Sequence, residues 1–124
     1  MEARLIARAV AVGRIGLGAG LVIAPQRFTN LWLGHDSGRA GTQVVSRGLG
    51  ARDIALGVGA LTADESQLGA WAAGAVMADA ADLVATIAAG RSLPVAGRAL
   101  VGALALGGAA LGAVALAGLS RGSS

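Results

Sequence analysis

Residues 99–120 read ALVGALALGGAALGAVALAGLS, a run of 22 residues without a charged side chain. An α-helix rises about 1.5 Å per residue, so this run is long enough to cross the roughly 30 Å hydrocarbon core of a bilayer. A surface helix of a soluble protein needs a polar face, and the only polar side chain here is Ser120. The run therefore predicts a membrane-spanning helix, which we place at residues 95–119.

Three further apolar segments precede this run, and we predict spans at residues 5–24, 42–62 and 67–89. Short polar turns around residues 64–66 and 90–94 separate the last three segments and are typical of antiparallel neighbours. We therefore expect an all-α fold, a four-transmembrane-helix antiparallel bundle that forms one membrane-embedded domain over residues 1–124. The expected location is the inner (plasma) membrane, with multiple passes through the lipid bilayer.

The connection at residues 25–41 is longer than the others and has a different pattern. Its large apolar residues Phe28, Leu31 and Trp32 recur at helical spacing. Such spacing is typical of an amphipathic segment that lies in the membrane interface. We expect a short interfacial helix here.

The composition excludes several classes of protein. Hydrophobic residues make up 55% and charged residues 14% of the chain, with a mean hydropathy of +0.69, which disfavours a soluble domain. All ten basic residues are arginines and they form no basic cluster, so we expect no nucleic-acid partner. Without cysteine and with a single histidine, the chain offers no thiolate chemistry, and we predict neither a metal site nor a cofactor.

Glycine accounts for 21 of the 124 residues and lies largely inside the predicted spans. The spacings Gly16-x-x-x-Gly20 and Gly108-x-x-x-Gly112 allow helices to approach closely in lipid. Two uses are open: packing within one chain, or a face for a homo-oligomer or a larger membrane complex.

The segment 42–62 carries charges that oppose its insertion into a bilayer. Its three charged residues cost roughly 9 kcal/mol on insertion-based scales, against roughly 3 kcal/mol from its aliphatic residues. Neighbouring helices must therefore stabilise it, so we expect it to contact the first and third spans and to be the most enclosed helix. The charged residues are Arg47, Arg52 and Asp53.

Opposite charges lie at matching depths if adjacent spans are antiparallel. Residues of the second and third spans share a depth when their numbers sum to about 130, which pairs Arg47 with Asp82 and Arg52 with Asp79. The same reasoning brings Arg14, midway along the first span, to Asp53. We therefore predict a cluster at bilayer depth, formed by Arg14, Arg47, Arg52, Asp53, Asp79 and Asp82.

Two motifs carry a family resemblance. The chain contains Arg47-Gly-Leu-Gly-Ala-Arg52-Asp53-Ile-Ala-Leu-Gly57 and later Ala78-Asp79-Ala-Ala-Asp82. With these motifs it resembles an uncharacterised family of small four-helix actinobacterial membrane proteins. The resemblance implies a four-helix fold, and it gives no information about an activity.

The predicted cluster has two functional interpretations besides simple locking of helix register. In the first, the six charged residues stabilise the bundle and bind an ion or the polar end of a lipophilic small molecule, in a protein that acts alone or as an accessory subunit. In the second, Asp79 or Asp82 is the general acid or base of a membrane-embedded isomerase or cyclase that acts on an isoprenoid-like substrate.

Overall fold

The computed structural model describes residues 2–122, which contain only helices and their connections. The four long helices are α1 (Glu2–Ile23), α3 (Ala40–Thr62), α4 (Glu65–Ala89) and α5 (Val95–Gly122). The connections hold the short helix α2 (Pro25–Leu33) and the 3-10 turns η1 (Gly34–Gly38) and η2 (Gly90–Ser92). The all-α prediction is confirmed. The first and last residues of each predicted span lie within 3 residues of the first and last residues of a long helix.

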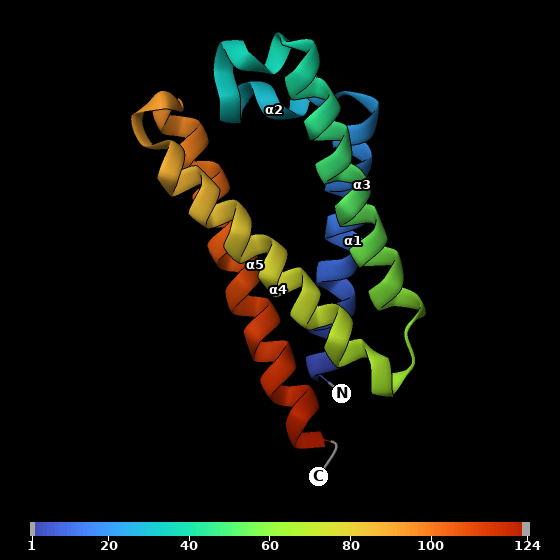
Figure 1. The fold of residues 1–124 in the computed structure, drawn as a ribbon. Helices are drawn as coiled ribbons and strands as arrows, with labels where there is room; N and C mark the ends of the chain where they lie inside the picture. The colour runs from blue at the N-terminus through green and yellow to red at the C-terminus, as the bar shows by residue number, and fades with distance from the viewer. Residues whose placement is uncertain (1, 123–124) are drawn as a thin grey trace.

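The long helices form two close pairs, α1 with α3 and α4 with α5 (Figure 1). Contacts between α1 and α5 join the pairs, whereas α3 touches α4 only lightly. The pairs meet at the end that carries both termini, here called the closed end, and separate toward the opposite, open end (Figure 1). Helix α3 contacts α1 and α4 as predicted. It is not enclosed on all sides, however, because Val44 and Val45 are 68% and 63% exposed.

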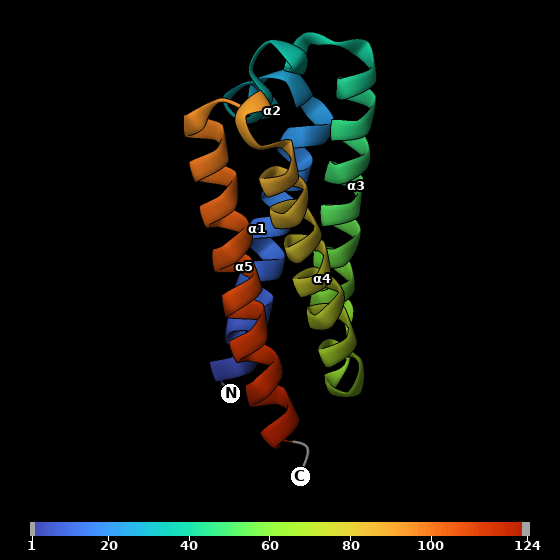
Figure 2. The same cartoon turned by 60° about the vertical axis from the view of Figure 1, so that its left-hand side comes forward.

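Helix α2 lies across the open end of the bundle (Figure 2). It begins at Pro25, whose ring fixes φ near the helical value and whose missing N–H is not needed at a helix start. It ends at Leu33, and the next residue, the C-cap Gly34, has a φ of 61°, a left-handed conformation that glycine tolerates. The ring of Phe28 fills the space beside Gly20 of α1, and the last turn of α2 packs on Gly97 of α5.

The most tightly packed core lies at the closed end and consists mainly of alanine. Small side chains let helix backbones approach closely, which is a common basis of helix packing in lipid. Leu68 is 1% exposed at the centre of this cluster. The other buried members are Ala7, Ala11, Ala60, Ala63 and Ala115.

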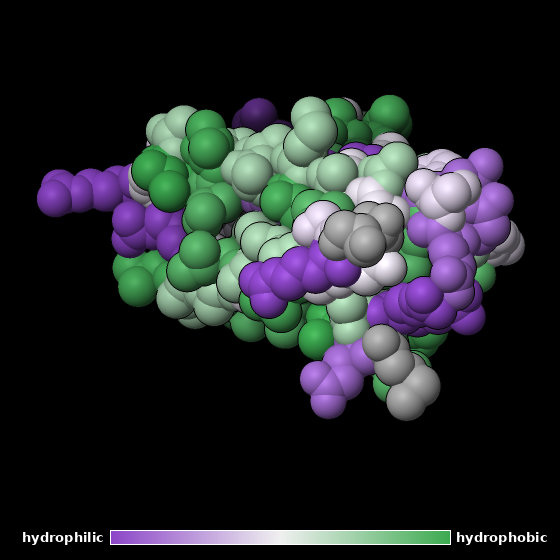
Figure 3. Space-filling view, turned by 90° about the horizontal axis from the view of Figure 1, so that it is seen from below, coloured by the Kyte–Doolittle hydropathy of each residue, from purple (hydrophilic) through white to green (hydrophobic). Residues whose placement is uncertain are grey.

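The outer faces of the helices are apolar. Ile23, Met77 and Val95 are each more than two-thirds exposed, at 79%, 72% and 72%. Figure 3 looks at the closed end and shows hydrophobic side chains over much of the molecule, with hydrophilic ones projecting at several places. Such a surface is suited to lipid around the helices and to water at the ends.

Three helical segments are long and apolar enough to cross a membrane: α1, α4 continued through η2, and α5. Helix α3 has 23 residues, which is sufficient length, but it carries charged residues near its middle. Three of the four predicted spans thus meet the requirement by their own composition. The structure supports a multi-pass membrane protein on this basis.

Candidate functional site

A cleft opens between the two helix pairs, on the inner side of α2. It has a volume of about 660 Å³ and is walled by apolar side chains of α1, α2 and α5, including Leu17, Leu21, Phe28, Leu31, Trp32, Leu100 and Leu104. Six charged residues also line it: Arg14, Arg27, Arg52, Asp53, Asp79 and Asp82. Five of these residues bind one another, and we call them the ion network: Arg14, Arg52, Asp53, Asp79 and Asp82. Arg27 does not belong to it.

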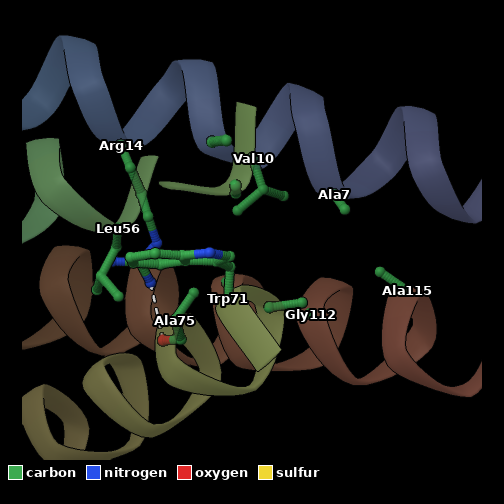
Figure 4. Close-up of a pocket in the computed structure, with 12 residues that line it drawn as sticks. Ala7, Val10, Arg14, Leu56, Trp71, Ala75, Gly112 and Ala115 are labelled. Carbon is green, nitrogen blue, oxygen red and sulfur yellow. Dashed lines mark hydrogen bonds between the residues drawn. The ribbon is translucent and has the colours of Figure 1, made fainter. Parts of the chain in front are cut away.

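Arg14 of α1 is the innermost cation of the ion network, with 8% of the residue exposed. Its Nη1 lies 2.8 Å from Oδ1 of Asp53, and its Nη2 lies 2.5 Å from Oδ1 of Asp79. The same Nη2 donates a hydrogen bond of 2.9 Å to the carbonyl of Ala75, which Figure 4 shows. One guanidinium therefore connects α1 to α3 and α4, and the predicted pairing of Arg14 with Asp53 is confirmed.

Arg52 of α3 forms the outer half of the ion network. Its Nη1 and Nη2 donate to Oδ1 and Oδ2 of Asp82 at 3.0 and 2.7 Å, a bidentate arrangement that fixes both side chains. Its Nε and Nη2 also donate to Oδ1 of Asp53, at 3.3 and 3.1 Å. The side chains of Arg52 and Asp82 are 30% and 25% exposed, so this half borders the cleft.

Two of the predicted pairings are wrong. Asp82 binds Arg52 and not Arg47, and Asp79 binds Arg14 and not Arg52. Pairing by depth assumed that residue numbers at the same depth sum to about 130, whereas the numbers of Arg52 and Asp82 sum to 134. The register of α3 against α4 therefore differs from the assumed one by about one helical turn. Pairing by depth also treated α3 and α4 as direct neighbours, whereas Arg14 reaches between them from α1.

Arg47 lies apart from the ion network. Its side chain is exposed and its Nε donates to the carbonyl of Val22 at 3.2 Å, near the end of α1. It is on the same helix as Arg52 but five residues earlier, which turns it about 140° around the axis. The ion network therefore unites five of the six predicted residues, and Arg47 is not among the residues that line the cleft.

Glycines of α5 make room for the ion network. A Cβ at Gly108 would collide with the carboxylate of Asp79, and one at Gly112 would collide with Val76. The spacing Gly108-x-x-x-Gly112 thus serves packing within the chain. Gly16 is different, because a Cβ there would meet nothing within 4 Å.

The ion network is closed toward the core and open toward the cleft. On the core side, Figure 4 shows a small cavity between Arg14, Leu56, Trp71 and Val10, with alanine and glycine on its remaining walls. Its volume is about 20 Å³, room for roughly one water. The larger space lies on the other side, so a ligand would reach the carboxylates through the cleft.

Sequence reasoning missed the contribution of α2 to this site. The spacing of Phe28, Leu31 and Trp32 indicates an amphipathic segment, and these residues line the cleft together with Arg27. The pattern showed which face is apolar. It contained no signal that this face turns toward the space between the helix pairs.

The chain was compared with protein-family models, with curated proteins and with solved structures. None of the three comparisons found a match. The site itself has two chemical capacities: binding of a polar group between carboxylates and guanidiniums, and proton transfer by Asp79 or Asp82.

Proposed function

We propose that this chain is a four-span protein of the inner (plasma) membrane that binds the polar end of a lipophilic molecule on the ion network. The observation that supports this most is the position of the network. Its carboxylates and guanidiniums form one wall of an apolar cleft of about 660 Å³, within the range of roughly 300–1,000 Å³ usual for small-molecule sites. Charges needed only to lock helices together would not require such a space.

Helix α3 is the fourth span in this proposal. It packs against α1 over most of its length. Both of its central charged residues form ion pairs with other helices, Arg52 with Asp82 and Asp53 with Arg14. These ion pairs offset the free-energy cost of placing the charged side chains of α3 in lipid. The resemblance to small four-helix actinobacterial membrane proteins is in line with this topology.

A cleft-filling substitution tests ligand binding. Leu104 lines the cleft, whereas Leu106 on the same helix does not, and both side chains are more than half exposed. We expect Leu104→Trp to expel a small lipophilic molecule that co-purifies with the wild-type protein and with the control Leu106→Trp. Native mass spectrometry of the protein in a mild detergent measures this. Equal retention of the same molecules by all three proteins would contradict the proposal.

A second candidate function is supported by the exposure of both α4 acids to the cleft. Asp79 and Asp82 would serve as general acid and base toward an isoprenoid-like substrate whose polar end is held by an arginine. The isosteric variants Asp79→Asn and Asp82→Asn distinguish the two functions once a ligand is known. An enzyme loses turnover while still binding the molecule, and a binding protein has no turnover to lose.

A further inference from the structure

The charges of the ion network do not balance. Arg14 and Arg52 contribute two positive charges, and Asp53, Asp79 and Asp82 contribute three negative ones. With all five groups ionised, the set carries one excess negative charge. At bilayer depth an uncompensated charge is costly, so one further positive charge, supplied by a bound cation or by a proton on a carboxyl group, would balance the set.

The guanidinium groups have little capacity left for a ligand. Both Nη atoms of Arg14 and all three nitrogens of Arg52 already bind carboxylate or carbonyl oxygens. The Nε of Arg14 has no hydrogen-bond partner, but it is buried. Of the ten N–H groups on the two guanidiniums, these contacts take up seven, three on Arg14 and four on Arg52, so few donors remain for an anionic group.

The carboxylates, in contrast, have acceptor capacity to spare. Asp79 has a single ionic partner, Arg14, and no hydrogen bond to its Oδ2 occurs within residues 2–122. A carboxylate offers about four lone-pair positions across its two oxygens. In the described part of the chain, Asp79 is the one carboxylate of the network that combines a single cationic partner with an oxygen that accepts no hydrogen bond.

Arg27, the sixth charged residue that lines the cleft, is not part of the ion network. Arg27 belongs to α2 at the open end and is exposed, so solvent and salt screen it more than the interior groups. The walls between α2 and the network are apolar, with the aromatic rings of Phe28 and Trp32 among them. Rings of this kind also favour a nearby cation.

We infer that the ligand of the cleft is a lipophilic monocation, such as an organic amine or quaternary cation, whose charge is neutralised by the ion network beside Asp79. This inference rests on the proposed function and adds the charge of the ligand to it. The apolar walls take the hydrocarbon part, and the excess carboxylate takes the positive centre.

A pair of probes of nearly equal shape and opposite charge provides the test. Tetraphenylphosphonium and tetraphenylborate are titrated into the Trp71→Phe protein in nonionic detergent, where Trp32 in the cleft is the only remaining tryptophan. Quenching of its fluorescence reports binding. The same titration of Leu104→Trp/Trp71→Phe, read by calorimetry, gives the background of partition into the micelle.

We expect the cation to bind at least about tenfold more tightly than the anion after background subtraction, as loss of one charge-assisted contact would imply. Asp79→Asn removes the excess charge and should remove most of this preference, whereas Arg47→Gln, at a residue that does not line the cleft, should keep it. If both ions bind equally, or the anion binds better, the inference is overturned and the cleft remains a lipophilic site. If neither ion binds above the background, the proposed function fails with it.

Discussion

At the scale of single residues, Arg14 is the only buried arginine within residues 2–122. Its guanidinium binds acids on two different helices, Asp53 and Asp79, and it is almost fully buried. Arg47 is its natural counterpart for comparison, since it is also an arginine in a long helix but is exposed and has one hydrogen bond to a backbone carbonyl.

Arg14→Gln should destabilise the protein by about 3–5 kcal/mol, because removing one partner leaves buried carboxylates without compensation. Arg47→Gln should cost about 1 kcal/mol or less, the value of one ordinary hydrogen bond. Equilibrium unfolding in mixed micelles, followed by circular dichroism, measures both. Similar losses in the two variants would show that burial of Arg14 is not what matters.

At the scale of helices, α3 depends on close approach to α1. Gly50 lies against Gly18, and a Cβ placed on Gly50 would come within 2.6 Å of the carbonyl oxygen of Gly18 and 2.8 Å of Cβ of Leu21. Gly48, two residues earlier, has nothing within 4 Å of its Cβ position. Both glycines belong to the motif that begins at Arg47, and only one of them has a packing role visible in the structure.

Gly50→Ala should therefore destabilise the bundle by about 1–3 kcal/mol, because backbone atoms must move to admit the methyl group. Gly48→Ala should leave stability unchanged or raise it by up to about 1 kcal/mol through its better helix propensity. Thermal unfolding of the two variants in the same detergent gives the comparison. A loss from Gly48→Ala as large as that from Gly50→Ala would refute the packing argument.

The start of α4 gives a pH-dependent contribution that lies outside the apolar spans. Asp64 is the N-cap, and hydrogen bonds from the Ser66 hydroxyl and from the backbone N–H groups of Gln67 and Ser66 lower its pKa. Because the folded pKa lies below the unfolded one, the contribution is complete above the ordinary aspartate pKa of about 3.9 and is lost as the pH falls further.

Acidification from about pH 5 to pH 3 should consequently lower the melting temperature of the wild type more than that of Asp64→Asn. The difference between the two curves isolates this carboxyl group from the others that titrate in the same range. Parallel curves for both proteins would mean that the cap does not contribute through its charge.

The sequence predicted the helices much better than their contacts. Charge-free runs and polar turns mark the bounds of α4 and α5 directly, since length and hydropathy are local properties. Pairing of Arg52 with Asp82 depends on register and on the tilt of α4 away from α3, which follow from packing of small residues such as Gly108 and Ala115 across helices. No local pattern encodes that tilt, so the cleft itself could not be predicted.

At the scale of the whole molecule, four spans and three spans give different topologies. If α3 crosses the bilayer, η1 and η2 lie on one side and the turn between α3 and α4 lies on the other. If α3 does not cross, η1 and that turn share a side. The start of α1 and the last turns of α5 lie together at the closed end, with Gly118 against Ala3, and four spans place these two segments on one side of the membrane (Figure 1).

Single cysteines decide between these topologies without background, because the chain has none of its own. His35→Cys in η1, Gln67→Cys in the first turn of α4 and Ser92→Cys in η2 place thiols at three exposed positions. A membrane-impermeant maleimide should label 35 and 92 from one face of sealed vesicles and 67 only from the other. Labelling of positions 35 and 67 from the same face would show that α3 does not cross the membrane.

The contact of Arg14 with both Asp53 and Asp79 has a consequence for the order in which the chain is made. Helix α1 leaves the ribosome first, so its arginine waits until α3 supplies the first acid, and the remaining acids arrive only with α4. We therefore expect α1 to stay beside the insertion machinery until α3 emerges, and α3 to stay until α4 follows. The apolar α5 needs no such companion, and it is synthesised last, when all charged side chains of the network are already present.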